Sequence, residues 1–136
     1  MTKSEKRIES DLFKLIASSP LAKMVSGKVY RKGMRPEGAT TEDIVVKFLA
    51  GAEGQIQSGV IVVNVYVPDI ASKALKRKVE NTARVEQIED AVIDFVSGCT
   101  DTEYLYELDE TPYSLAVEGI DQHVVYSRIH YQRVII

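Results

Sequence analysis

The stretch GVIVVNVYVP, residues 59–68, decides the fold that we expect for this chain. It consists almost entirely of β-branched or aromatic residues, which favour strands, and Pro68 ends it. A strand with one face in water would alternate apolar and polar side chains, but Asn64 is the single polar side chain here. We therefore predict a central strand with both faces covered, one by helices and the other by more of the same chain or by another copy.

Two helices are predicted ahead of this strand. Thr2 and Glu5 have the spacing of a capping box, and apolar side chains then recur at helical spacing over residues 8–16. Ser19 and Pro20 are typical of an N-cap followed by the first helical position, which predicts a short second helix.

A third helix is predicted after the central strand. Apolar side chains recur at helical spacing over residues 85–96, and Gly98 follows them. Leu75 and Val79 would lie on the opposite side of this helix. The helix is therefore either continuous back to Leu75 with a second apolar patch, or it begins near Glu80. We expect a start close to Val79, with the basic cluster of residues 73–78 in the preceding loop or first turn.

Short segments of strand character make up the rest of the chain. Alternating side chains predict a long closing strand with one buried face, on which Val125, Ile129, Tyr131 and Ile135 lie. A turn at residues 50–55 predicts an antiparallel hairpin into the central strand. The predicted fold is a single α+β domain over residues 1–136, with a mostly antiparallel sheet packed against two or three helices. The remaining predicted strands are residues 28–31, 43–49, 104–108 and 113–117.

The net charge of −3 conceals a strong asymmetry along the sequence. Residues 1–84 carry fifteen Lys and Arg against nine Asp and Glu, whereas residues 85–127 carry eleven acids and no Lys or Arg. One interpretation is that solvated surfaces simply have uneven charge. The other is a subunit with one positive and one negative flank, which would favour head-to-tail association of identical copies.

The sequence contains no pattern that assembles a catalytic or metal site, and we expect no catalytic residue, cofactor or metal ligand. His123 and His130 differ by seven positions, so on one regular strand they face opposite sides. The acids from Asp101 to Glu110 could hold a divalent cation, but they lack the order of a calcium loop. Cys99 is the single cysteine, and no neighbouring motif marks it as a nucleophile.

Nucleic acid and membrane are also weakly supported as partners. Two basic clusters, residues 28–35 and 73–78, could bind phosphates, but the chain is acidic overall and has no nucleic-acid-binding signature. We expect no sequence-specific nucleic-acid partner. The chain has no run of about 18 apolar residues and no signal-peptide core, so we expect a cytoplasmic protein that does not enter a membrane.

Seven segments, in their order along the chain, form a pattern that matches a known family. They are residues 11–22, 25–30, the Gly and Pro loop 33–39, 43–46, 60–67, 85–92 and 125–134. This order of elements resembles the tail-completion proteins of long-tailed bacteriophages and prophages, also called tail terminator or head–tail joining proteins. The resemblance covers nearly the whole chain and is one of pattern rather than of a diagnostic motif. The chain departs from it in a longer basic insertion at residues 71–78 and in a loop before Ile44 that lacks the family's frequent proline.

The resemblance implies a phage tail-terminator-like α+β subunit without catalytic activity. Such subunits assemble, often as six-membered rings, at the end of the tail tube, and they contact tail-tube and head-connector proteins. The protein would then occur in the host cytoplasm and in the assembled virion. Our interface hypothesis is that a basic side of one copy meets an acidic side of the next. The basic side is Arg31, Lys32, Arg35, Lys73, Lys76, Arg77 and Lys78, and the acidic side is Asp101, Glu103, Glu107, Asp109 and Glu110.

Two alternatives belong to other functional classes. One is a small ligand-binding or metal-binding domain, with or without catalysis, that uses the acidic loop together with His123. It predicts a discrete monomer or dimer that a metal or small molecule stabilises. The other is a nucleic-acid-binding accessory protein, which predicts DNA affinity that falls steeply with salt.

Overall fold

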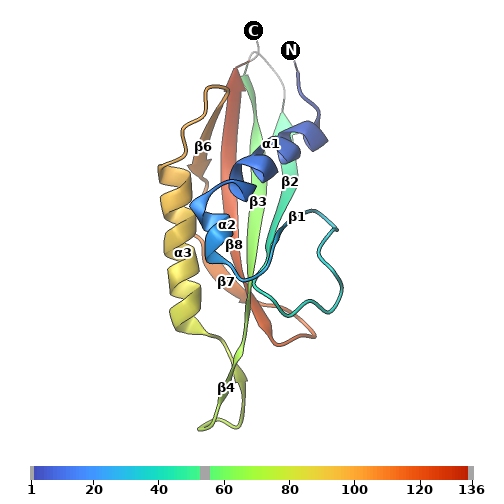
Figure 1. The fold of residues 1–136 in the computed structure, drawn as a ribbon. Helices are drawn as coiled ribbons and strands as arrows, with labels where there is room; N and C mark the ends of the chain where they lie inside the picture. The colour runs from blue at the N-terminus through green and yellow to red at the C-terminus, as the bar shows by residue number, and fades with distance from the viewer. Residues whose placement is uncertain (1, 53–55, 135–136) are drawn as a thin grey trace.

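The computed structural model describes residues 2–52 and 56–134 of the chain. Three helices and eight strands are described in these ranges (Figure 1). In chain order they are α1 Glu5–Ala17, α2 Pro20–Met24, β1 Val29–Arg31, β2 Ile44–Ala52, β3 Ile56–Pro68, β4 Ile70–Ser72, β5 Arg77–Val79, α3 Thr82–Ser97, β6 Tyr104–Leu108, β7 Tyr113–Ala116 and β8 Gln122–Val134.

The predicted central strand, β3, lies in the middle of a six-stranded sheet. The strand order is β1-β2-β3-β8-β6, and β7 also pairs with β8. Only the β1–β2 pair is parallel among the described strands, and the other pairs are antiparallel. The α+β class and the mostly antiparallel sheet are therefore confirmed. The predicted hairpin into β3 is confirmed by its register, but residues 50–52, predicted as part of its turn, continue strand β2 and pair with β3. Residues 53–55 lie outside the described part of the chain.

The three helices lie over one face of the sheet and form the hydrophobic core with it (Figure 1). The predicted stripe of α1 is buried, as are Ile88 and Val92 of α3. From β3, Ile61, Val63 and Val65 point into this core and are fully buried. Because successive strand residues alternate between faces, the even-numbered residues of β3 lie on the opposite face, away from the three described helices.

The helix starts differ from prediction by a few residues. The side chain of Ser4, rather than the Thr2–Glu5 capping box, caps α1 by accepting a hydrogen bond from the Arg7 backbone N–H. Helix α3 begins at Thr82, three residues after the predicted start, because the side chain of Asn81 accepts a hydrogen bond from the Arg84 backbone N–H. A hydroxyl and an amide oxygen both satisfy the free N–H groups of a first turn.

The basic cluster of residues 73–78 was predicted in the loop or first turn ahead of the helix, and the structure bears this out only in part: residues 73–76 form a turn, but Arg77 and Lys78 lie on a short strand that was not predicted. The cluster belongs to a two-stranded hairpin, in which β4 and β5 pair between Ile70 and Val79. Lys76 in its turn has a φ of 53°, in the left-handed region that a tight turn requires. The hairpin projects beyond the end of the sheet, at the bottom of Figure 1.

The loop between β1 and β2 is held by a buried carboxylate. Asp43 is 1% exposed, and it accepts hydrogen bonds from the Lys28 backbone N–H, the Thr41 hydroxyl and Arg35 Nε, each at 2.9 Å. The Arg35 guanidinium also stacks 4.0 Å from the ring centroid of Tyr66. The glycine- and proline-containing loop is thereby fixed against β3.

Candidate subunit-interaction surfaces

The face of the sheet away from the helices carries exposed apolar side chains. Leu105, Tyr113 and Leu115 share this face with the even-numbered residues of β8, and they are 41–53% exposed. The ring of Tyr113 lies 5.5 Å from that of Tyr126. Single exposed apolar residues are ordinary, but several on one uncovered sheet face are typical of a surface that is buried on association.

A row of polar side chains crosses the middle of the same face. Val62 is fully buried there because its cross-strand neighbours are the long side chains of Lys47 and Arg128. Arg128 is held in place by Asp109, whose carboxylate lies 3.1 Å from its Nε. Next to this row, the buried amide oxygen of Asn64 has no hydrogen-bond partner among the described residues.

The β4–β5 hairpin is a second exposed surface, and it is strongly basic. It carries two exposed apolar side chains, Ile70 at 46% and Leu75 at 58%. None of its basic side chains forms an ion pair with a residue in 2–52 or 56–134. These basic side chains, all exposed, are Lys73, Lys76, Arg77 and Lys78.

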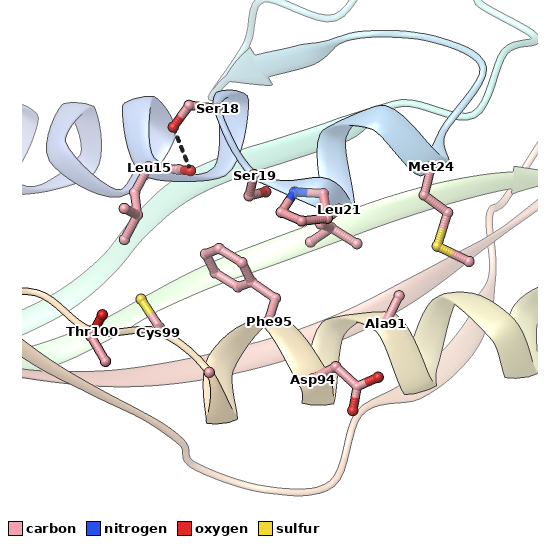
Figure 2. Close-up of a pocket in the computed structure, with 12 residues that line it drawn as sticks. Leu15, Ser18, Ser19, Leu21, Met24, Ala91, Asp94, Phe95, Cys99 and Thr100 are labelled. Atoms are coloured by element: carbon pink, nitrogen blue, oxygen red, sulfur yellow. Dashed lines mark hydrogen bonds between the residues drawn. The ribbon is translucent and has the colours of Figure 1, made fainter.

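A groove of about 530 Å³ lies between α3 and the segment that joins α1 to α2 (Figure 2). Its walls are mostly apolar: Met24 comes from α2, and Ala91 and Phe95 come from α3. Figure 2 shows the Phe95 ring between the two helical segments and the Cys99 thiol at the end of the groove. Burial raises the pKa of the Cys99 thiol, with a smaller contribution from Asp101, which favours the protonated thiol over the thiolate.

An acidic stripe runs along the solvent side of α3 and reaches the edge of this groove at Asp94. Glu86, Asp90 and Asp94 are spaced by four residues, so they lie on one side of the helix, and all three are exposed. Partial burial, followed by the charges of Glu80, Asp90 and Glu86, raises the pKa of Glu89. Among the described residues, none of the three stripe carboxylates forms an ion pair. The sequence analysis missed the stripe as a site, although its spacing of four residues is visible in the sequence.

Two residues of the predicted basic side are engaged within the chain. Arg31 pairs with the buried carboxylate of Glu9 at 3.0 Å and donates to the Lys6 carbonyl at 2.8 Å. Arg35 pairs with Asp43, as described above. Lys32 is exposed in the loop, at a distance along the chain from the hairpin. The residues of the predicted basic side therefore do not form one surface. Those on the β4–β5 hairpin are exposed and lie next to exposed apolar side chains.

The predicted acidic side is split in the same way. Glu103 binds Lys3 at 2.7 Å and also contacts Arg133, and the pKa of its carboxyl is lowered, first by the Lys3 hydrogen bond. Asp101 accepts backbone N–H groups of its own turn. Asp109 pairs with Arg128. Glu107 and Glu110 are exposed, so these two keep the surface position that the hypothesis requires.

The structure does not bring together the residues of the ligand-binding alternative. His123 lies 2.7 Å from Asp69 through its Nδ1, at the base of the β4–β5 hairpin. His123 lies opposite Ala116 near the start of β8. The acidic loop is contacted by Arg128, which lies five residues further along β8. The two positions on β8 are therefore about 17 Å apart. Across residues 2–52 and 56–134, no three His, Cys, Asp or Glu side chains group closely enough to hold a metal ion.

The comparisons with known proteins add no family assignment. Neither the protein-family models nor the curated proteins contain a match to this chain. In the described part of the chain, every helix is too short or too polar to cross a membrane.

Proposed function

We propose that this chain is a structural virion protein of a phage or prophage, a tail-completion or head–tail joining subunit. Copies would form a ring at the end of the tail tube, where the ring stops tube growth and contacts the head connector. The sequence resemblance names this class, and the α+β fold with its helices on one face is compatible with it.

One observation carries the proposal: the chain has two charged surfaces of opposite sign, and their side chains form no ion pair with residues 2–52 or 56–134. The β4–β5 hairpin is basic and projects beyond the sheet, and the solvent side of α3 is acidic. A monomer gains nothing from either surface, since like charges close together repel. In an assembly of identical copies, each surface could meet its opposite on a neighbour.

Because the basic surface and the acidic surface are different patches of the chain, contact between them favours a ring over a two-fold dimer. A two-fold dimer uses the same patch on both subunits, whereas a head-to-tail contact joins two different patches. Such contacts produce a closed ring when the rotation between copies closes, as the resemblance implies for this chain, and a filament when it does not.

The proposal can be tested by co-expressing the chain with the tail-tube protein encoded by the same genome. We expect electron microscopy to show tail tubes of limited length with a ring at one end, because a bound terminator blocks further addition. Tube protein expressed alone, and tube protein with an unrelated protein of similar size, serve as controls. Tubes of the same length and without a terminal ring in the presence of the chain would reject the proposed function.

A further inference from the structure

We propose that the β4–β5 hairpin of one copy docks into the groove between α3 and the α1–α2 segment of the next copy. This inference rests on the self-assembly in the proposed function and specifies which surfaces make the contact. Leu75 would enter the apolar groove, while the basic side chains of the hairpin lie against the acidic stripe Glu86, Asp90 and Asp94.

The hairpin has the chemistry of an inserted element. Leu75 lies in its turn and is 58% exposed, an unfavourable position for a large apolar side chain unless it is covered. Basic residues flank it on both sides, at Lys73 and Lys76, with Arg77 and Lys78 following. An exposed apolar side chain flanked by positive charges is suited to bind an apolar groove that has negative charges at its edge.

The groove is such a recess. Its volume of about 530 Å³ falls in the range of concave sites that hold ligands or inserted side chains. Ala91 and Phe95 form its α3 wall, and Asp94 stands at its edge with its carboxylate directed away from Phe95 (Figure 2). Asp90 and Glu86 precede Asp94 by four and eight residues, so the acidic stripe runs from this edge of the groove along the solvent side of α3 toward its N-terminal end.

Geometry requires that the two surfaces meet between copies. The hairpin leaves the N-terminal end of α3 and points away from it, whereas the groove extends along the C-terminal half, from Ala91 to Cys99 (Figure 1). Helix α3 has 16 residues, which corresponds to a length of about 24 Å. A hairpin therefore cannot reach the groove of its own chain, and the contact joins unlike surfaces of two copies.

Cys99 provides a direct test, because the single cysteine of the chain lines the groove. In the variant Leu75→Cys, oxidation with copper phenanthroline should link residue 75 of one copy to Cys99 of the next. We expect a ladder of disulfide-linked species on a non-reducing gel, which collapses to monomer on reduction. Leu75 is exposed, so the substitution should leave the fold intact.

Two matched variants control this experiment. Lys32→Cys places a thiol on another exposed basic loop and should give no ladder beyond dimer. Leu75→Cys combined with Cys99→Ser should lose the ladder as well. If the unmodified chain assembles but Leu75→Cys cross-links no further than Lys32→Cys, the docking inference is wrong and the proposed function stands. If the unmodified chain forms no assembly, both fail.

Charge exchange gives a second, independent readout. We expect the pair Lys76→Glu and Lys78→Glu, or the pair Asp90→Lys and Asp94→Lys, to weaken self-association at low salt at least about tenfold. Mixing the two charge-reversed proteins should restore association between them, which a merely destabilised protein could not do. Sedimentation velocity measures all three samples. Full assembly by each variant alone, or no recovery on mixing, would overturn the inference.

Discussion

Replacing Asp43 with alanine is expected to lower the free energy of unfolding by about 3–5 kcal/mol, because it leaves the guanidinium of Arg35 without its carboxylate. The side chain of Arg35 is only 13% exposed, so water cannot replace the lost charge. The Lys28 backbone N–H and the Thr41 hydroxyl would lose their acceptor as well. Equilibrium unfolding in urea at neutral pH measures the loss.

Two substitutions bracket this prediction. Asp43→Asn keeps the shape and an acceptor oxygen but removes the charge, so we expect a smaller loss than for alanine. Glu37→Ala removes an exposed acid from the same loop and should change stability by no more than about 0.5 kcal/mol. A value for Asp43→Ala as small as that for Glu37→Ala would show that the ion pair does not hold the loop.

Replacing Gly59 with alanine is expected to cost about 3 kcal/mol, at the upper end of overpacking effects. In the sheet, Gly59 lies opposite Gly51 on one side and Tyr131 on the other. A Cβ at residue 59 would lie 2.1 Å from the Ala50 carbonyl oxygen and 2.9 Å from the Tyr131 ring. Because the first of these is a backbone atom, β2 would have to move away from β3.

Gly98→Ala is the matched control. The nearest atom to its added Cβ is the Asp94 carbonyl oxygen at 3.2 Å, and the helix-like conformation of residue 98 suits alanine. Thermal unfolding should therefore show a large decrease in melting temperature for Gly59→Ala and a small change for Gly98→Ala. Equal melting temperatures for the two variants would mean that the sheet accommodates the methyl group.

The elements with strong periodicity could be predicted from the sequence, and the weakly patterned ones could not. The continuous apolar run of β3 and the alternation of apolar and polar residues along β8 each extend over many residues. In both strands, the local sequence preference and the tertiary packing favour the same structure. Ile135, placed on the buried face of β8, lies outside the described residues. The β4–β5 hairpin was missed because its strands have three residues each and its turn uses Lys76, which carries no turn signal.

The surfaces were predictable only in part, for a physical reason. Charge segregation is visible along the sequence, but ion pairs between distant residues are not. Arg31 and Glu9 are 22 positions apart, and only the packing of α1 on β1 brings them together. The groove likewise exists because α2 lies beside α3, and no spacing within either helix indicates that neighbour.

Native mass spectrometry shows whether identical copies of this chain bind one another. For the unmodified chain at low salt, we expect one dominant closed assembly at a fixed multiple of 15.2 kDa, which dissociates as salt is raised. A single species of 15.2 kDa at every concentration and salt tested would mean that the copies do not associate.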